Sequence, residues 1–571
     1  MSIEILPSEV IDLIAAGEVI DSLLAVVREL VENALDAGAT RISITVSPEL
    51  WQIQVADNGL GMTLEDLRVC AKPHSTSKIH SSQDLWHITS LGFRGEALHS
   101  ISQVADLTVC SRLAGRLEAV GWRVRYQLGE PTSEEAIAIA PGTVVTASNI
   151  FGQMPVRRRA LPKATTQLKA IQKLVQHLAL CHPEITWQVR HNKKIWLHFS
   201  SGNSAQQVLP QFLRQVTPSD LHYLRSLVNQ PEETEDSATI ELILGLPDRL
   251  HRHRPDWIKV AVNGRVVRCP ELEQTIIAGM ARTLPRDRFP VAFLHLHLDP
   301  AQIDWNRHPA KVEIYLRDLE YWQGQVNQAI ESALKLNNDN LPQAIGDRRI
   351  KQVLKAAEAT GNYESETSEK SGTTETSGIS RSTEKAKSEL GSLELTAVAQ
   401  VNKTYIVAEH PYGVWLVEQH IAHERILYEQ IQDHWQLVSL EKPIVLSQLK
   451  QSQVTQLESI GIEIEPFGED LWKVRNAPEA IASRQDCPEA LLEFSWGGDL
   501  QTAQVATACR TAIKNGTELD LPTMQSILDR WQATRNPRTC PHGRPIYLSL
   551  EETTLARFFR RHWVIGKSHG I

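Results

Sequence analysis

A glutamate and an asparagine four residues apart, Glu29 and Asn33, are the side chains of this chain best suited to act on a water molecule. In a helix, residues i and i+4 lie one turn apart on the same face. The carboxylate can then take a proton from water while the amide oxygen ligates a hard cation such as Mg²⁺. The spacing therefore predicts a site that activates water beside a metal ion. An ordinary amphipathic helix with a solvated polar face is the alternative.

The helix that must carry this polar pair is predicted by the apolar residues around it. Their spacing of i, i+3, i+4 and i+7 is typical of a buried helix face. The residues in this stripe are Val27, Leu30, Val31 and Ala34. The polar pair then projects from the opposite side of the helix. Gly38 follows the stripe and suits the left-handed residue that ends many helices.

A second motif, Asp57-Asn-Gly-Leu-Gly61, follows a segment, Trp51–Ala56, whose alternation predicts a half-buried strand. A carboxylate at a strand end can accept a hydrogen bond from the amine of an adenine. Gly59 and Gly61 let the backbone approach a flat base and adopt unusual φ values. Taken alone, such a motif is usually only a turn.

Three further segments complete the pattern. His74–Ile79 is a hydroxyl-rich turn, Leu91–Leu98 contains two glycines before a helix-prone run, and Pro141–Val145 is predicted as a turn entering a strand. The N-terminus of a helix presents free N–H groups to phosphate. In this order, the motifs together predict a nucleotide site.

This order of motifs resembles the GHKL ATPase superfamily. Four segments resemble the MutL family of DNA mismatch repair proteins in their residue sequence. They are Ile14–Val19, Glu29–Ala39, Thr76–Ile79 and Leu91–Leu98. The resemblance implies an ATP- and Mg²⁺-binding domain with a lid over the phosphates. It assigns roles as follows: Glu29 as general base for ATP hydrolysis, Asn33 as Mg²⁺ ligand, Asp57 as adenine ligand, Thr143 as support for the Asp57 region, Gly92, Phe93, Arg94 and Gly95 as lid, and Gly59, Gly61, Thr76, Ser77 and Lys78 as further nucleotide contacts.

The resemblance continues beyond this region. Val262–Arg265 is predicted as strand–turn–strand, and Val291–Leu298 alternates like a strand. They precede Asp304–Lys311, which ends in the His-Pro-Ala-Lys motif of MutL-like proteins. In that family the lysine reaches from a second domain to the γ-phosphate of ATP. Lys311 is therefore expected to be a catalytic sensor, and a solvated loop lysine is the alternative.

Composition indicates a multidomain globular protein, with 571 residues of which 42% are hydrophobic and 22% charged. Seven cysteines are too few, and odd in number, for a disulfide framework. No apolar run approaches 18 residues and no N-terminal signal is visible, so we expect a cytoplasmic protein without a membrane partner. The net charge of −9 is unlike that of a DNA-binding protein. Local basic clusters at Val156–Arg159, His251–Arg254 and Arg557–Arg561 are nevertheless candidates for weak, salt-sensitive contact with DNA that reads no bases.

The segment Lys355–Ser392 is dominated by Glu, Ser, Thr, Lys and Gly and cannot bury enough apolar surface to offset the entropy of ordering. It predicts a flexible linker. We therefore predict an α/β multidomain protein made of four parts. These are a GHKL (Bergerat) α/β-sandwich ATPase domain at 1–215, a ribosomal-S5-like βαβ transducer domain with the sensor lysine at 216–336, the linker at 337–393, and an α+β C-terminal dimerisation and endonuclease-like domain at 394–571.

After the linker, two strands around Pro411-Tyr-Gly413 are predicted to form a hairpin that leads into a helix. His420 and Glu424 lie at i and i+4 on that helix, a spacing that can bind a transition metal. Cys540 and His542 lie two apart on a loop shaped by Pro and Gly and can face one ion. Cys509 adds a thiol. The alternative is a capped helix with buried cysteines.

These features resemble the C-terminal domain of MutL proteins with endonuclease activity, whose pattern is Asp-Gln-His-Ala-x-x-Glu. Here Glu418 stands in place of the Asp and Ile421 in place of the Ala. The resemblance implies metal ligands at His420, Glu424, Cys509, Cys540 and His542, with Zn²⁺ or Mn²⁺ bound, and a catalytic role for Glu418. The longer carboxylate of Glu418 makes a metal site better supported than a competent nuclease, because ligand distances tolerate little change.

The family resemblance also implies partners. Mismatch recognition would belong to MutS, a sliding clamp could bind near Gln436–Leu440, and the chain would form a homodimer through its C-terminal domain with ATP-dependent association of the N-terminal domains. The expected outcome is a nick in one DNA strand. One alternative is an ATP-switched matchmaker that recruits repair factors and never cuts. Another is a different member of the superfamily, such as a topoisomerase subunit, a chaperone or a histidine kinase, although no cleavage-domain tyrosine or phosphoacceptor helix is identified.

Overall fold

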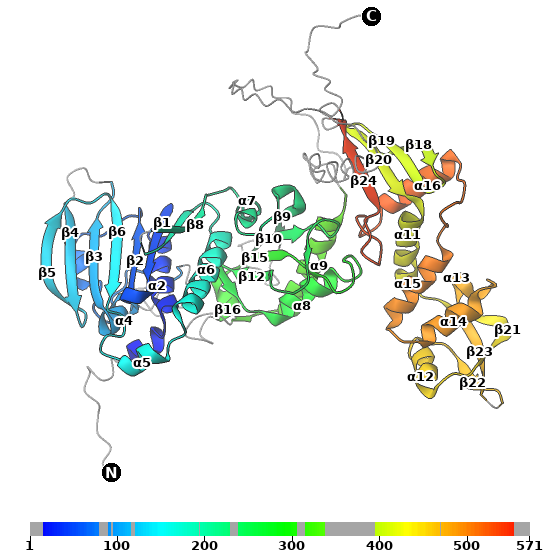
Figure 1. Cartoon of the computed structure of the whole chain (residues 1–571), viewed down its shortest axis with the longest axis horizontal. Helices are drawn as coiled ribbons and strands as arrows, with labels where there is room; N and C mark the ends of the chain where they lie inside the picture. The colour runs from blue at the N-terminus through cyan, green and yellow to red at the C-terminus, as the bar shows by residue number, and fades with distance from the viewer. Residues whose placement is uncertain are drawn as a thin grey trace, which may run out of the picture. The chain divides into compact units, whose positions relative to one another are not determined.

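The computed structural model describes residues 15–78, 90–92, 95–115, 120–192, 194–228, 238–304, 314–336, 394–468, 470–552 and 555 of the chain. Most of the elements are labelled in Figure 1. Two units form. Unit 1 comprises Met1–Gly245, Arg254–Gly279 and Pro290–Ile330, and unit 2 comprises Leu246–His253, Met280–Phe289 and Glu331–Ile571.

The first sheet of unit 1 has eight strands in the order β5-β4-β3-β6-β2-β1-β7-β8. Neighbours are antiparallel except β1 and β7, which are parallel. The strands are β1 (Arg41–Ser47), β2 (Gln52–Asp57), β3 (Asp106–Arg112), β4 (Gly121–Gln127), β5 (Glu130–Ile137), β6 (Gly142–Ser148), β7 (Thr186–His191) and β8 (Lys194–Phe199). The helices of this region are α2 (Leu23–Asp36), α3 (Leu64–Val69), α4 (Ala97–Val104), α5 (Pro155–Ala160), α6 (Ala164–Cys181) and α7 (Ala205–Val208).

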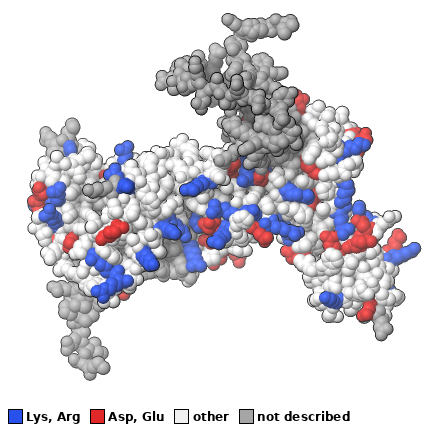
Figure 2. All heavy atoms as spheres, viewed as in Figure 1, with Lys and Arg blue, Asp and Glu red and all other residues white. Residues whose placement is uncertain are grey.

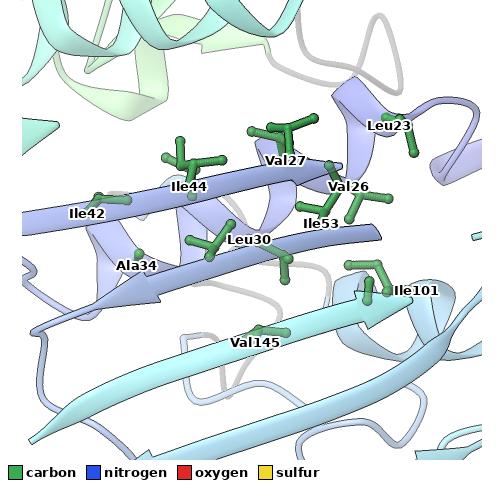
Figure 3. Packing of buried hydrophobic residues seen from close by; sticks show 14 of the residues in the cluster. Leu23, Val26, Val27, Leu30, Ala34, Ile42, Ile44, Ile53, Ile101 and Val145 are labelled. Atoms are coloured by element: carbon green, nitrogen blue, oxygen red, sulfur yellow. The ribbon is translucent and has the colours of Figure 1, made fainter. Parts of the chain in front are cut away.

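Helix α2 forms as its sequence predicts. The Ser22 hydroxyl caps it by accepting a hydrogen bond from the N–H of Ala25 at 3.2 Å. Gly38, with φ of +70°, follows its end in the left-handed conformation. All four residues of the predicted apolar stripe are buried. Figure 3 shows this face of α2 packed on the sheet, and Val27 and Leu30 belong to the same buried cluster as Ile44 and Ile53. Burial of each of the valine and leucine side chains in this stripe stabilises the fold by about 1.5–3 kcal/mol.

The second sheet of unit 1 has the order β13-β12-β15-β10-β9. Its strands are β9 (Leu221–Val228), β10 (Ala238–Gly245), β12 (Ile258–Val262), β13 (Arg265–Val267) and β15 (Ala292–His297). The predicted strand over Val291–Leu298 is confirmed as β15, and it is buried from Ala292 to Leu296. It pairs with β12 along one edge and with β10 along the other, and its successive buried residues show that both of its faces are covered. The predicted strand–turn–strand at Val262–Arg265 is confirmed as the β12–β13 hairpin.

Smaller elements complete this part of the chain. They are the strand pairs β11 (His251–Arg252) with β14 (Phe289–Pro290) and β16 (Ile303–Asp304) with β17 (Tyr315–Leu316), and the helices α8 (Pro270–Gly279) and α9 (Leu319–Leu334).

From residue 394 onward, unit 2 contains two sheets. One has the order β18-β19-β20-β24, and the other β21-β23-β22. The predicted hairpin is confirmed, because β19 (Tyr405–His410) pairs with β20 (Gly413–Glu418) around the expected turn. The other elements are β18 (Thr396–Val401), β21 (Leu437–Ser447), β22 (Ile464–Pro466), β23 (Leu471–Pro478), β24 (Tyr547–Glu551), α11 (Gln419–Asp433), α12 (Gln451–Ser459), α13 (Glu479–Ala482), α14 (Cys487–Ser495), α15 (Leu500–Thr511) and α16 (Leu521–Gln532).

Helices α15 and α16 pack on α11, which follows β20 directly. Among the described helices, none combines the length and the apolar character needed to span a bilayer. The predicted linker lies outside the described residues.

Candidate functional site

The predicted pair on α2 is half-buried on the side opposite the core. The ammonium Nζ of Lys78 donates to Asn33 Oδ1 at 3.1 Å and lies 2.5 Å from Asp36 Oδ2. Asn33 Oδ1 therefore already accepts from a positively charged group. Mg²⁺ is a hard cation that takes oxygen ligands, so this side-chain oxygen fits the metal that the sequence predicts.

Asp36 connects α2 to the start of the predicted lid. Its Oδ1 accepts from the N–H of Leu91, and its Oδ2 accepts from the N–H of Gly92, both at 2.9 Å. With Lys78, this carboxylate joins three segments of the chain. Sequence reasoning missed Asp36. Its position three residues after Asn33 on the same helix is a signal that could have found it.

Asp57 ends β2, as predicted. Its Oδ1 accepts from the N–H of Gly59 at 2.9 Å and from the N–H of Thr143 at 3.3 Å. Both of these bonds fall on Oδ1, which leaves Oδ2 able to accept from a ligand. Burial raises the pKa of Asp57, and the two backbone hydrogen bonds offset part of this rise. Thr143 supports Asp57 through its backbone, while its hydroxyl contacts Ser111 Oγ at 2.9 Å.

The glycine positions near Asp57 leave no room for side chains. Gly61 has φ of +72°, and a Cβ there would lie 2.1 Å from the carbonyl oxygen of Arg112.

The hydroxyl-rich turn is tied to the lid segment, because the N–H of Ser75 donates to the carbonyl of Gly95 at 3.2 Å. Thr76 accepts from the N–H of Lys78 within the same turn, and Ser77 is exposed. Phe93, Arg94 and Lys311, the last predicted as a sensor, lie outside the described residues.

In unit 2, three of the five predicted metal ligands meet. Ligand atoms of Glu424, Cys540 and His542 all lie within 4.8 Å of one another. Glu424 and Cys540 are fully buried. Glu424 Oε1 lies 2.9 Å from His542 Nδ1, yet neither atom has a well-directed hydrogen bond. A buried carboxylate oxygen and a buried imidazole nitrogen without well-directed hydrogen bonds, together with a nearby thiol, match the donors that Zn²⁺ binds.

Electrostatics favour charged forms in this group. The nearby Cys540 thiol and Glu424 carboxylate raise the pKa of His542 to about 9. Burial by itself raises the pKa values of Cys540 and Glu424. The nearby His542 and Arg544 outweigh that effect and lower both pKa values. A thiolate and a carboxylate are the protonation states that ligate a metal.

His420 is held in the tautomer that a metal ligand needs. Its Nδ1 lies 2.8 Å from the carbonyl oxygen of Ile513 and must donate to it, so Nε2 keeps its lone pair. Metal-binding histidines commonly donate their second N–H to such a carbonyl. Cys509 on α15 is half-buried. Burial raises its pKa, with further contributions from the charges of Glu424 and Cys540. Neither residue belongs to the close group of three.

Both carboxylate oxygens of Glu418 are engaged. Oε2 caps α11 by accepting from the N–H of Ile421 at 2.5 Å, and Oε1 accepts from Asn515 Nδ2 at 2.5 Å. Asn515 is a second residue that sequence reasoning missed, because it lies 97 positions away. The structure thus holds Glu418 as a helix cap.

The predicted basic cluster on α5 is partly structural. Figure 2 shows basic side chains gathered where Figure 1 places α5. Arg158 lies over the Trp51 ring at 4.6 Å and donates to the carbonyl of Ile150 at 3.2 Å. Arg159 is exposed.

The predicted clamp-binding segment leads into β21, where Leu437 pairs with Pro478 of β23.

Comparison with known families agrees with this architecture. A family described as histidine kinase-, DNA gyrase B-, and HSP90-like ATPase matches residues 21–140. A DNA mismatch repair protein C-terminal domain matches 222–335, and a MutL C terminal dimerisation domain matches 398–519. The N-terminal region is thus a GHKL-type ATPase domain within a multidomain α/β protein.

Whole-chain relatives are more specific. DNA mismatch repair protein MutL of Rippkaea orientalis is 59% identical over all of this chain and 99% of its own length. MutL of Methanoculleus marisnigri is 31% identical over 98% of this chain and 99% of its own. The chain belongs to the MutL family of DNA mismatch repair proteins. A crystal structure of the Aquifex aeolicus MutL ATPase domain with ADP aligns over 54% of this chain and 98% of its own, with a TM-score of 0.37 and 21% identity.

Proposed function

We propose that this protein is an ATP-driven switch of DNA mismatch repair and that hydrolysis takes place on α2. Glu29 acts as the general base toward water, Asn33 ligates Mg²⁺, and Asp57 binds the adenine amine through Oδ2. Bound Mg²⁺ would neutralise charge on the triphosphate. The observation that carries the proposal is the Lys78 ammonium on Asn33 Oδ1, since a positive charge already lies where the metal is needed.

Steady-state hydrolysis by Glu29→Ala tests this proposal. Loss of a general base lowers kcat by about 10²- to 10⁴-fold, whereas affinity for ADP should stay near that of the wild type. Glu49→Ala is the matched control, because Glu49 is a largely exposed glutamate of the same domain. Hydrolysis by Glu29→Ala at the rate of Glu49→Ala would refute the assignment.

We further propose that Glu424, Cys540 and His542, with His420 and Cys509, hold Zn²⁺ or Mn²⁺ in a C-terminal endonuclease centre that nicks one DNA strand. Such a metal would activate water and stabilise the phosphate charge. The donor set and the tautomer of His420 support this proposal. Lys311 would contact the γ-phosphate of ATP from the second domain and so couple the nucleotide state to the rest of the protein.

The partners proposed with this function come from the family. They are DNA contacted without base readout, MutS for recognition of the mismatch, a sliding clamp at Gln436–Leu440, and a second copy of the chain. The second copy would join through the C-terminal dimerisation domain that matches 398–519. ATP would promote association of the N-terminal domains.

An ATP-switched matchmaker without nuclease activity is the second candidate, and the engagement of both Glu418 oxygens favours it. Nicking of supercoiled plasmid with Mn²⁺ separates the two candidates. A nuclease should nick, and His420→Ala should abolish nicking while leaving ATP hydrolysis unchanged. Absence of nicking by the wild type with intact ATP hydrolysis would support the matchmaker.

A further inference from the structure

The β12–β13 hairpin presents one arginine from a rigid turn. Asn263 and Gly264 have φ of +44° and +82°, as in the tight turns that favour an Asn-Gly pair. A Cβ on Gly264 would lie 3.1 Å from the ring of His182. A side chain at this position would therefore crowd that ring as well as strain the backbone.

Side chains hold this turn from several directions. The Asn263 side chain exchanges two hydrogen bonds of 2.8 Å with the backbone of Leu298. The N–H of Gly264 donates to His295 Nε2 at 3.0 Å, and His182 Nε2 donates to the Gly264 carbonyl at 3.2 Å. His295 is buried, and burial lowers its pKa well below the usual value, so it stays a neutral acceptor. The residue that follows Gly264 is therefore fixed in direction.

That residue, Arg265, extends from the second sheet to the ATPase helix. Its Nη2 donates to Glu32 Oε2 at 2.7 Å, and the two side chains are only 9% and 5% exposed. The same nitrogen contacts the carbonyl oxygen of Leu91. Glu32 lies on α2 between Glu29 and Asn33. Arg265 thus contacts the helix that carries the predicted base and metal ligand.

The Leu91 backbone is held from two sides. Its N–H donates to Asp36 on α2, and its carbonyl accepts from Arg265 on β13. Gly92, the next residue, lies against Asn33 and Lys78, because a Cβ there would be 3.5 Å from Asn33 Oδ1 and 2.9 Å from Lys78 Nζ. A shift of Leu91 would therefore move the backbone that borders the metal ligand.

We propose that Arg265 is a positioning residue of the ATPase reaction, which fixes Glu32 and the Leu91–Gly92 backbone and thereby links the metal end of the site to the second sheet. This inference rests on the proposed ATPase function. A guanidinium suits the role because it stays charged and its rigid plane fixes the direction of the N–H bonds, whereas a lysine ammonium is a point charge on a flexible stem. Adenine binding at Asp57 does not involve this contact.

The experiment compares full-length wild type with Arg265→Lys and Glu32→Gln, which keep much of the size and polarity of each residue. Arg268→Lys is the matched control, because it makes the same change at an exposed site of the same segment. Thermal melting first shows that each variant is folded. Two readouts follow: kcat and KM for ATP with the affinity for ADP, and amide hydrogen exchange at Leu91 and Gly92 without nucleotide.

We expect both variants to lower kcat by about 2- to 30-fold, the range for residues that transmit coupling. Affinity for ADP should change far less, and exchange at Leu91 and Gly92 should rise in both variants but not in the control. The inference would be overturned if the amide exchange rates at Leu91 and Gly92 in both variants equalled those of the wild type. It would also be overturned if kcat and the affinity for ADP fell by equal factors. If the wild type itself hydrolyses no ATP, the proposed function fails, whereas the exchange readout still decides whether Arg265 holds this backbone.

Discussion

Lys78→Met removes the ammonium that joins Asn33 to Asp36 but keeps most of the aliphatic chain. The Lys78–Asp36 pair has a separation of 2.5 Å, with side chains 21% and 11% exposed. Breaking a fully buried pair costs about 3–5 kcal/mol, and partial solvent screening reduces this to about 2 kcal/mol. Asp36 also keeps the N–H groups of Leu91 and Gly92 as partners, which limits the loss.

The expected result is a lower melting temperature for the nucleotide-free ATPase domain. For a domain of roughly 200 residues, about 2 kcal/mol corresponds to about 4–8 °C. Removal of the ammonium also takes away the positive charge that the Asp36 carboxylate and Asn33 Oδ1 contact. Mg²⁺ without nucleotide should therefore raise the melting temperature of Lys78→Met more than that of the wild type.

Differential scanning fluorimetry of the full chain, with and without Mg²⁺, measures both effects. Lys72→Met is the control, because Lys72 pairs with Glu130 at 3.5 Å and these side chains are 43% and 68% exposed. Loss of such an exposed pair should change stability by less than about 1 kcal/mol. Equal Mg²⁺ increments in Lys78→Met and the wild type would refute the view that the ammonium occupies the metal position.

Three further outcomes are expected. Burial raises the pKa of Asp57, and its ionised form must accept the adenine amine. On acidification, the affinity for ADP measured by calorimetry should therefore fall at a higher pH than it would if the aspartate were exposed. An affinity for ADP that stays constant until the pH reaches the pKa range of an ordinary aspartate would contradict this. Cys540→Ser should lower the zinc content of purified protein measured by mass spectrometry, with Cys487→Ser, a buried cysteine outside the group, as control. Asn515→Ala should release Glu418 Oε1 and raise any Mn²⁺-dependent nicking, and unchanged nicking would show that Asn515 does not restrain that carboxylate.

The residues of α2 show which features of the fold a local sequence pattern can predict. The i, i+3, i+4, i+7 stripe predicts which face is buried, and Gly38 marks the end of the helix. The strand that ends at Asp57 and the hairpin before α11 were predicted for the same reason, since burial and turns leave a periodic mark in a short window. The motif order likewise predicted the family, which the whole-chain relatives confirm.

Other features depend on residues that meet only after folding. Arg265 and Glu32 are 233 positions apart, and Glu424 and His542 come from separate segments that the packing of unit 2 brings together. No periodicity encodes such contacts, because strand order and helix packing decide them. For the same reason the strand pattern of Val291–Leu298 did not show that β15 lies in the middle of its sheet and is buried in succession from Ala292 to Leu296. The chain alone determined which side chains could do chemistry, and tertiary structure decided which of them hold one another in place.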